Sequence, residues 1–364
     1  MIGRHAIPML LLLLASCAGP VISPLASPTG SPLASPSAAR SAAATPSASG
    51  STAPVIGWSL LSSADGPAAR SDHTFTLNAT GSKAYLFGGQ TADGSPLGDL
   101  WELDLATAGW RRIDTHGPAP RFGHNAAWVP GVGLVVFAGQ GTTFFNDLWS
   151  FDPKASRWRK LPGAGDVPVP RYGSCAALGP DGRLWISHGF TSEGTRFADT
   201  RAYDFGTRAW TNETPAGELP VKRCLHACWW TDDGRLALYG GQTTGVPALG
   251  NLWFLSQGPR PGTNAWSAAD VPGALRPRQL PAATRWNAAT VVFGGGSRGG
   301  GWLADAWRID DAGRIRRISS GPGPSARAGA ELVADPLRHR LLLFGGRNGD
   351  GPSAELWALA VPAA

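Results

Sequence analysis

Leu86-Phe87-Gly88-Gly89 is the stretch that decides the fold, because a closely similar phrase returns five more times along the chain. The other copies are Val136-Phe137-Ala138-Gly139, Ile186-Ser187-His188-Gly189, Leu238-Tyr239-Gly240-Gly241, Val292-Phe293-Gly294-Gly295 and Leu343-Phe344-Gly345-Gly346. From Phe87, the equivalent positions follow at intervals of 50, 50, 52, 54 and 51 residues. A period of about 50 residues indicates repeated supersecondary units that stack on one another.

Each unit also has polar and aromatic residues at nearly constant distances from the phrase. An arginine lies 15 to 17 residues before the position of Phe87 or its equivalent. The six arginines are Arg70, Arg121, Arg171, Arg223, Arg278 and Arg327. An acid or amide follows the Phe87 position by 10 to 12 residues, in the order Asp99, Asp147, Asp199, Asn251, Asp305 and Glu355. A tryptophan stands two residues after the acid or amide, except in the third unit, which has Arg201. A second tryptophan ends most units.

This combination of an arginine, a glycine pair and two spaced aromatic residues resembles the kelch repeat. The resemblance runs from about Trp58 to the end of the chain and covers six units. It implies an all-β, six-bladed propeller similar to the central domain of galactose oxidase. A propeller of the WD type has a shorter repeat of about 40 to 45 residues and its own Gly-His and Trp-Asp marks, so the kelch type is favoured.

The strand pattern within a unit supports four strands, with the second unit as template. We expect strands at 125–128, 134–137 and 148–151 and a fourth around Trp158. The second strand is apolar throughout, as in a sheet covered on both faces. The third strand alternates, and its tryptophan side is expected to pack on the next blade. The fifth unit, with Pro281 in its first strand and isoleucine in place of the last tryptophan, is expected to be the most irregular.

The two ends of the repeat region complement each other. The sixth unit lacks its last tryptophan strand, whereas Trp58-Ser59-Leu60-Leu61 precedes the first unit without a place in it. We therefore expect this segment to form the outer strand of the sixth blade. Such a strand closes the ring and leaves no open sheet edge or exposed blade face.

The residues before the repeats predict export and anchoring. Residues 1–17 have a short basic start and an apolar run too short to span a bilayer, which is typical of a signal peptide. Leu14-Ala15-Ser16-Cys17 resembles the lipobox of bacterial lipoproteins, which implies acylation of Cys17. Residues 18–56, rich in Ala, Ser and Pro, are expected to be a disordered linker, and 57–364 the propeller. The predicted location is outside the cytoplasm, held to a bacterial membrane by lipid alone.

The arginines have two possible roles, which the sequence leaves open. Antiparallel strand order brings all six to one rim of the propeller, together with the glycine pairs and the acids. In kelch proteins of the stress-sensor adaptor class, which these segments resemble, arginines at this position line a mouth for acidic peptides. Here they would bind an anionic protein or glycan. Alternatively, each arginine pairs with its own unit's acid as a repeated structural ion pair, and the nearly equal numbers favour this.

The loops after the glycine pairs, which vary between units, are expected to set specificity. Phe144, Phe145 and Trp302 are the candidate binding residues in these loops. His73, His124 and His226 occupy equivalent places in three units, so they should diverge rather than converge on one metal ion, and no metal or cofactor is predicted. His188 replaces the first glycine of its pair, which we interpret as drift in a weaker repeat.

The remaining cysteines leave a second question open. Cys175, Cys224 and Cys228 lie in the third and fourth units, where an exported protein could form a bridge. Cys175 is expected in the first strand of the third blade, beside the first strand of the fourth. Cys224 and Cys228 lie about 13 Å apart on one extended strand, so a bond between them needs a bend. Buried free thiols are the favoured interpretation.

Two classes of function fit these features. The first is a monomeric envelope lipoprotein that binds a protein or glycan through the arginine-bearing face. The second is an enzyme on acidic sugars, similar to bacterial N-acetylneuraminate epimerase, which would use an arginine and a carboxylate such as Glu193. The chain has no nucleophile elbow, phosphate loop or HExxH zinc motif, so the binding module is favoured. The net charge of +6 is spread without a basic run, so no nucleic-acid partner is predicted.

Overall fold

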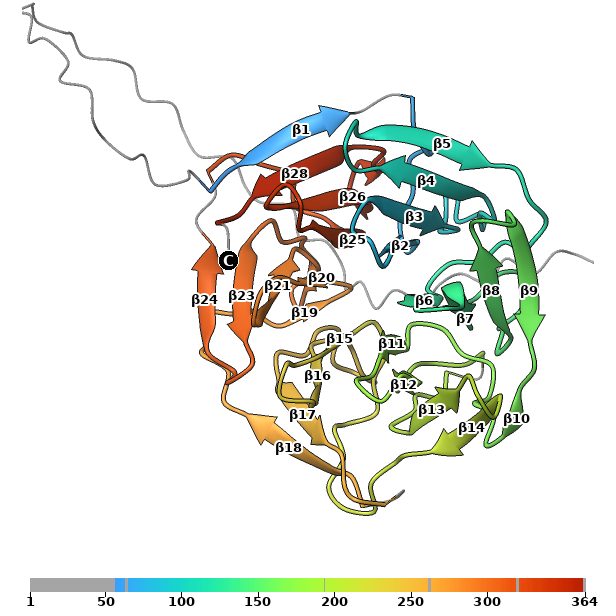
Figure 1. Ribbon diagram of the computed structural model, residues 1–364. Helices are drawn as coiled ribbons and strands as arrows, with labels where there is room; N and C mark the ends of the chain where they lie inside the picture. Colours follow the sequence, from blue (N-terminus) through green and yellow to red (C-terminus); the bar gives the residue numbers. More distant parts are fainter. Residues whose placement is uncertain (1–55, 63–64, 193, 261–262, 319–320, 363–364) are drawn as a thin grey trace, which may run out of the picture. The chain divides into compact units, whose positions relative to one another are not determined.

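The computed structural model describes residues 56–62, 65–192, 194–260, 263–318 and 321–362. Every regular element in these ranges is a β-strand, and no helix there is long and apolar enough to cross a membrane. Six sheets of four or five strands are arranged in a ring, as the sequence predicted (Figure 1), and their innermost strands line a central cavity. The predicted signal peptide, Cys17 and nearly all of the predicted linker lie outside the described residues.

Each blade is built on four antiparallel strands. The first of them in a repeat unit lies beside the channel, and each later one lies farther out. Blade 1 contains β2 (Thr74–Leu77), β3 (Lys83–Phe87), β4 (Leu100–Asp104) and β5 (Gly109–Ile113). Blade 2 contains β6 (Asn125–Val129), β7 (Gly133–Phe137), β8 (Leu148–Asp152) and β9 (Arg157–Leu161). Blade 3 contains β11 (Cys175–Leu178), β12 (Leu184–Ser187), β13 (Thr200–Asp204) and β14 (Ala209–Asn212), with β10 (Ala164–Gly165) added in parallel. Blade 4 contains β15 (Ala227–Trp230), β16 (Leu236–Tyr239), β17 (Leu252–Ser256) and β18 (Ala265–Ala269).

The last two blades differ from this pattern. Blade 5 contains β20 (Ala282–Arg285), β21 (Ala289–Phe293), β23 (Ala306–Asp310) and β24 (Ile315–Ile318). The short strands β19 (Arg278–Gln279) and β22 (Gly296–Ser297) form a separate two-stranded pair. Pro281 lies between β19 and β20 in the chain, and this interruption confirms that the blade is irregular. Blade 6 contains β25 (Ala328–Asp335), β26 (Arg340–Asn348), β27 (Gly351–Pro352) and β28 (Leu356–Ala360).

The N-terminal strand closes the ring, as predicted. Strand β1 (Trp58–Ser62) pairs antiparallel with β28, and Trp58 lies opposite Leu359. Figure 1 shows β1 on the outer edge of blade 6, beside blade 1. The indole of Trp58 lies 5.2 Å from the ring of Phe293 in blade 5. The same contact between an outer tryptophan and the preceding blade recurs in Phe87–Trp158, Phe137–Trp210 and Phe344–Trp110.

The apolar core lies between neighbouring blades. The central residues of the second strands are buried, because the blades on both sides cover them. The predicted direction of the third-strand stripe is wrong. Trp101 and Leu103 pack against Phe344 of blade 6, which precedes blade 1, and Trp307 and Ile309 likewise pack on blade 4. The alternation of residues along the strand shows that one of its sides is apolar. Which neighbouring blade that side contacts depends on the direction in which the blades follow one another around the ring.

Two closed belts of backbone hydrogen bonds join the six blades near the arginine-bearing rim. In the first belt, the backbone N–H of the second residue of each glycine pair donates to the backbone carbonyl of the next blade's arginine. The series begins with Gly89, which donates to Arg121, and closes with Gly346 of blade 6, which donates to Arg70 of blade 1. The second belt links the residues two positions after the arginines. Each of these donates to its equivalent in the preceding blade, in the closed series Asp72, Gly329, Leu280, Leu225, Gly173 and Gly123.

The belts explain the glycine pairs. A Cβ on Gly88 would lie 2.5 Å from the carbonyl oxygen of Arg121, and Gly88 has a φ of 64°. Ala138 and His188 occupy the equivalent position with φ values of 62° and 60°, a conformation that costs a residue with a side chain about 1 kcal/mol or more. The repeated glycine-pair motif is thus the place where the backbone of one blade lies against the backbone of the next.

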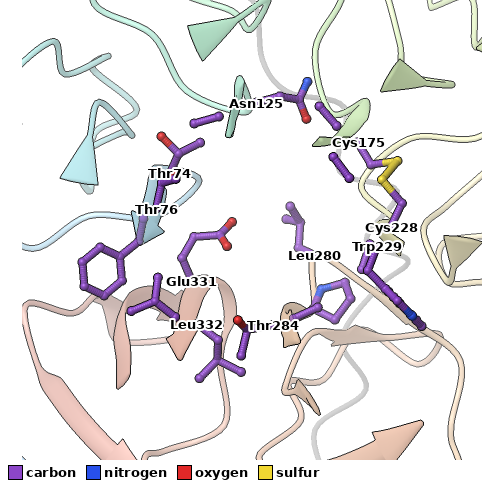
Figure 2. A pocket seen from close by; sticks show the side chains of 18 of the residues that line it. Thr74, Thr76, Asn125, Cys175, Cys228, Trp229, Leu280, Thr284, Glu331 and Leu332 are labelled. Atoms are coloured by element: carbon purple, nitrogen blue, oxygen red, sulfur yellow. A yellow bond between two sulfur atoms is a disulfide. The ribbon is translucent and has the colours of Figure 1, made fainter. Parts of the chain in front are cut away.

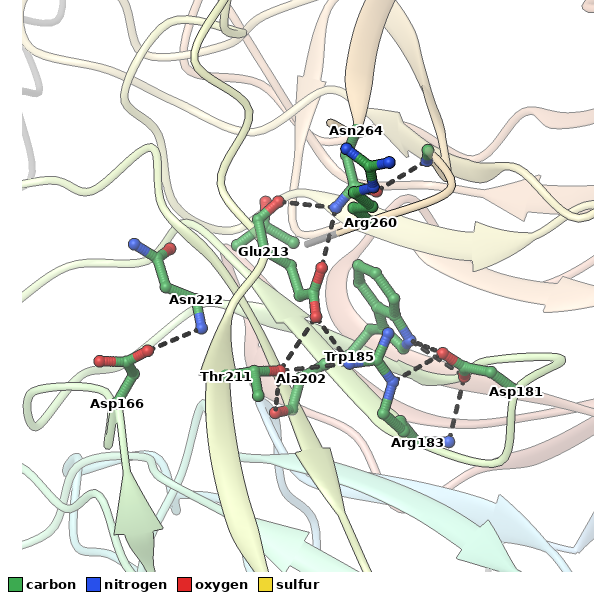
Figure 3. Close-up of polar contacts among 12 residues, drawn as sticks. Asp166, Asp181, Arg183, Trp185, Ala202, Thr211, Asn212, Glu213, Arg260 and Asn264 are labelled. Carbon is green, nitrogen blue, oxygen red and sulfur yellow. Dashed lines mark hydrogen bonds and ion pairs between the residues drawn. The ribbon is translucent and has the colours of Figure 1, made fainter. Parts of the chain in front are cut away.

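A polar network also joins blades 3 and 4 at their outer edge (Figure 3). The buried Glu213 follows β14, and its carboxylate accepts hydrogen bonds from Arg183 at 2.6 Å and from Asn264 Nδ2 at 3.0 Å. The same amide group of Asn264 donates to the Glu213 carbonyl at 2.9 Å. The carboxylate is therefore paired and hydrogen-bonded, as a buried charge requires.

Candidate binding face

The six repeated arginines are buried at one rim of the propeller, where their guanidinium groups are held inside the fold. Arg121 is typical. Its Nε donates to the Ala119 carbonyl at 3.0 Å and its Nη1 to the Ala138 carbonyl at 2.9 Å. The guanidinium also forms a two-point ion pair with Asp147, at 2.7 and 3.2 Å. The equivalent ion pairs are Arg70–Asp99, Arg171–Asp199, Arg278–Asp305 and Arg327–Glu355.

The acid of each pair has a second role. Asp147 Oδ2 also accepts a hydrogen bond from the indole of Trp149 at 2.7 Å, and Trp101, Trp307 and Trp357 repeat the contact with Asp99, Asp305 and Glu355. Burial opposes ionisation of Asp147, but the hydrogen bonds and charge of Arg121 outweigh it, so its pKa lies below the ordinary value. This explains why the arginine, the acid and the tryptophan recur together in the sequence.

This geometry supports the structural alternative for the arginines. The side chains of Arg70, Arg121 and Arg278 have no exposed surface. A ligand could reach these guanidinium groups only after the ion pairs opened. Their predicted role as ligand-binding residues remains a prediction, and the exposed part of the face is made by other side chains. Glu193, the carboxylate named for the enzyme alternative, lies outside the described residues.

Blade 4 breaks the series because Asn251 stands where the other blades have an acid. Arg223 Nη1 donates to Asn251 Oδ1 at 2.7 Å, but Arg223 Nη2 and the indole nitrogen of Trp253 are buried without a hydrogen-bond partner. In blades 1, 2, 5 and 6 a single carboxylate oxygen accepts from both of the equivalent donors. Burial lowers the pKa of Arg223 to about 10, which reflects a guanidinium with no compensating charge.

The predicted loop aromatics have different surroundings. Phe145 lies against the Arg121 guanidinium, 4.1 Å from its ring centroid, so it supports the ion pair. Phe144 packs beside Phe190, with their ring centroids 6.1 Å apart. Trp302 is half-buried in blade 5, and its backbone forms an isolated antiparallel β-bridge with Gly296. Of the three, only Phe144 belongs to the aromatic cluster around the channel mouth.

We call this cluster the rim aromatic cluster; it consists of Phe122, Phe144, Tyr172 and Phe190, packed with Leu225. Tyr172 contacts Phe122 at 5.8 Å and Phe190 at 6.3 Å, and Arg196 lies over the Phe190 ring. Phe122 and Tyr172 directly follow a repeated arginine, and Phe190 directly follows His188-Gly189, which replaces the glycine pair in its unit. Sequence analysis missed Tyr172 and Phe190, although aromatic residues at repeat positions where most units have small or polar residues were a usable signal.

Exposed valines extend the apolar surface of the same rim. Val169 and Val221 stand two residues before Arg171 and Arg223, whose Nε groups bond to their carbonyls, so the two valines are equivalent in neighbouring blades. Their side chains remain about half exposed, at 49% and 46%, and Val167 lies close by in sequence at 38%. Large apolar side chains exposed on one face are typical of a surface that binds a partner.

His73, His124, His188 and His226 are buried, and their pKa values lie far below the ordinary value, so these four side chains are neutral. Burial and the charge of Arg70 lower the pKa of His73 to about 3, and burial lowers those of His124 and His226 well below the ordinary value. His188, in the glycine position, packs against His226 at 5.4 Å. The described residues include no group of three or more His, Cys, Asp or Glu side chains that could hold a metal ion.

The expectation of three free thiols is wrong. Cys175 on β11 and Cys228 on β15 form a disulfide between blades 3 and 4, with Cα atoms 5.8 Å apart, whereas Cys224 is free and buried. The innermost strands of adjacent blades converge at the channel, which brings two cysteines from different units within bonding distance.

Comparisons with known proteins agree with this architecture. The family model described as the KLHDC2/KLHL20/DRC7 Kelch-repeats domain matches residues 57–241, just over half of the chain. Adagio-like protein 3 of rice (Oryza sativa subsp. japonica) is 33% identical over 177 residues, which cover 46% of this chain and 28% of the rice protein. Kelch domain-containing protein 10 of Xenopus tropicalis is 28% identical over 67% of this chain and 63% of that protein.

The chain thus spans about a third or less of the first rice relatives it matches. Among solved structures, one titled "Structure of YjhT" superposes with a TM-score of 0.63, covers 80% of this chain and 95% of that chain, and is 17% identical. This likeness concerns the fold alone. The repeats, the closed ring and the family match together establish that this chain belongs to the kelch-repeat family.

Proposed function

We propose that this chain is an envelope lipoprotein whose kelch propeller binds another protein through the arginine-bearing face. The observation that supports this most directly is the apolar surface on blades 2 to 4, made by the partly buried Phe144 and Phe190 of the rim aromatic cluster and by the exposed Val167, Val169 and Val221. The buried ion pairs beneath it hold the loops rigidly, which lowers the entropy lost on binding. Aromatic anchors in such a surface contribute most of the affinity in protein interfaces.

The face has a polar edge that favours a partner with carboxylates. Arg196 lies over Phe190 beside the cluster, and Arg347 is about one-third exposed at the channel mouth, where it pairs with Asp72 at 2.7 Å. We propose a partner segment that combines apolar side chains with acidic ones. A carboxylated glycan shares the acidic part of this chemistry and serves as a comparison ligand.

The double substitution Val169→Asp and Val221→Asp is expected to weaken partner binding at least about tenfold, because it places two charges in an apolar contact surface. Partners are captured from envelope extracts on the immobilised propeller and their affinities are measured by titration. The matched control is Leu337→Asp, an equally radical change at an exposed leucine in the turn on the opposite rim. If the double variant and the control bind every captured partner as well as the native chain does, this face is not the binding surface.

The anchor is tested separately. Growth with a labelled fatty acid is expected to label the native chain, and Cys17→Ser is expected to abolish the label and move the protein to the soluble fraction. Cys224→Ser, which removes a buried free thiol, is the control that should keep the label. Equal labelling of the Cys17→Ser variant and the native chain would contradict lipidation at this residue.

A further inference from the structure

The central channel encloses a cavity of about 540 Å³. Its wall is built from the innermost strands of all six blades, below the belt formed by Asp72 and its equivalents. Volumes of about 300 to 1,000 Å³ are typical of small-molecule sites. The cavity lies next to the rim aromatic cluster, because Leu225 and Leu280 line its wall and also pack on that cluster, whereas Val167, Val169 and Val221 are not part of the wall.

Glu331 on β25 directs its carboxylate into this cavity (Figure 2). It stands four residues after its blade's arginine. In blades 1 and 2 the equivalent residues bond to the next blade, Thr74 to His124 at 2.9 Å and Asn125 to Ser174 at 2.8 Å. In blade 3 the equivalent residue is Cys175 of the disulfide. Among the described residues, no side chain or backbone group forms a hydrogen bond or ion pair with the Glu331 carboxylate.

The other charged groups around the cavity are already compensated. Asp72 accepts from Arg347, Gln90 and Ser71, and Arg285 pairs with Asp311 and Asp232. At the far end of β25, Asp335 pairs with Arg338 and Arg340. The histidines that line the wall, His73, His124 and His226, are neutral at physiological pH because burial lowers their pKa values. Glu331 is therefore the one uncompensated carboxylate on the described wall.

The surroundings of Glu331 suit an ammonium group. The side chains of Thr76 and Thr284 lie on the two strands that flank β25, and Asn125 lies across the cavity (Figure 2). Their oxygens can accept hydrogen bonds, and an ammonium group has three N–H donors. The half-buried Leu280 supplies apolar surface nearby. A bare metal ion would lack ligands, because the described residues hold no cluster of three metal-binding side chains.

We propose that this cavity binds a small primary amine in its protonated form, with the ammonium group on the Glu331 carboxylate and the carbon chain against Leu280. The amine supplies the charge that the channel lacks. No covalent step is involved, and the propeller serves as a receptor for the amine at this site.

Binding should be coupled to release of a proton. Burial, and then repulsion from Asp72, raises the pKa of Glu331 to about 8, so the empty site is mostly protonated at neutral pH. An ammonium ion binds the ionised form, and this form gains population as the pH rises from 6 to 8. The affinity for the amine should therefore rise roughly tenfold per pH unit, as long as the Glu331 carboxyl is mostly protonated in the empty site.

The experiment is isothermal titration of the full chain with n-butylamine and 1,4-diaminobutane at pH 7, in phosphate and in MOPS buffer. We expect binding of at least one amine with release of about one proton, seen as a buffer-dependent enthalpy. Glu331→Gln, which keeps size and polarity, should weaken binding at least about tenfold and abolish the proton release. The control variant is Glu218→Gln at an exposed carboxylate, and the control ligand is n-butanol, which lacks the charge.

Equal amine binding by native protein and Glu331→Gln would overturn the proposal, as would the absence of binding by both amines at pH 8. A thermal melt of each variant confirms that it is folded. The partner-binding substitutions at Val169 and Val221 should leave amine affinity unchanged, so the two proposals can fail independently.

Discussion

Replacing Arg121 by alanine is expected to lower the free energy of unfolding by about 3 to 5 kcal/mol, the usual cost of breaking a buried ion pair from one side. The substitution leaves the Asp147 carboxylate without its partner and the carbonyls of Ala119 and Ala138 without their donors. It also opens a gap beside the Phe145 ring. Denaturation by guanidinium chloride, followed through tryptophan fluorescence, measures the change.

The pH dependence separates the ion pair from simple loss of packing. The pKa of Asp147 is depressed in the folded state, so the pair stabilises the fold above the ordinary value of 3.8 and loses this contribution as the pH falls through the folded value. The difference between native protein and Arg121→Ala should therefore shrink in acid. A difference that stays constant from pH 7 to below pH 3 would show that the carboxylate is not involved.

Blade 4 provides the matched comparison. Arg223→Ala should cost less, about 1 to 2 kcal/mol, because it leaves a neutral Asn251 and not a buried charge. Conversely, Asn251→Asp should stabilise the protein by about 1 to 2 kcal/mol, since the new carboxylate accepts from Arg223 Nη2 and the Trp253 indole. If Arg121→Ala and Arg223→Ala cost the same, the ion pairs contribute no more than the hydrogen bonds to carbonyls.

Trp58→Ala is expected to lower the free energy of unfolding by about 3 kcal/mol, the lower end of the range for a large aromatic residue, because the side chain is half-buried. The indole packs on Phe293 of blade 5, and a Cβ on Gly323 would lie 2.4 Å from it, so the ring is held between two segments of the chain. Its loss weakens the contact that holds β1 across the junction of blades 5 and 6. Chemical denaturation again gives the magnitude.

The neighbouring Leu60 is the control on the same strand. Its side chain is 47% exposed, so Leu60→Ala should change stability by only about 0.5 kcal/mol. Hydrogen exchange at β28 should increase in Trp58→Ala, because β28 pairs with β1 at one edge. Unchanged stability and unchanged exchange in Trp58→Ala would mean that the ring remains closed without this strand's tryptophan.

The sequence alone determined the repeat, the four strands of a blade and the closing strand. These features depend on local spacing: a glycine pair where backbones meet, alternating side chains along a strand, and a tryptophan strand missing from one end and present at the other. Unit 2 is predicted almost residue by residue, since its strands begin at Asn125 and Leu148 as expected. Hydrophobic periodicity records which residues are buried in a blade, whatever their neighbours are.

Only the tertiary structure decided how the charged and sulfur-containing groups are used. The sequence could not distinguish an open ring of arginines from buried ion pairs, because both place Arg121 and Asp147 on the same rim. It could not pair Cys175 with Cys228, nor show that Glu331 faces the channel while Asn125, its equivalent, bonds to Ser174. Spacing within a repeat determines where a side chain stands in its own blade, whereas its partner belongs to another part of the ring and is set by how the blades meet.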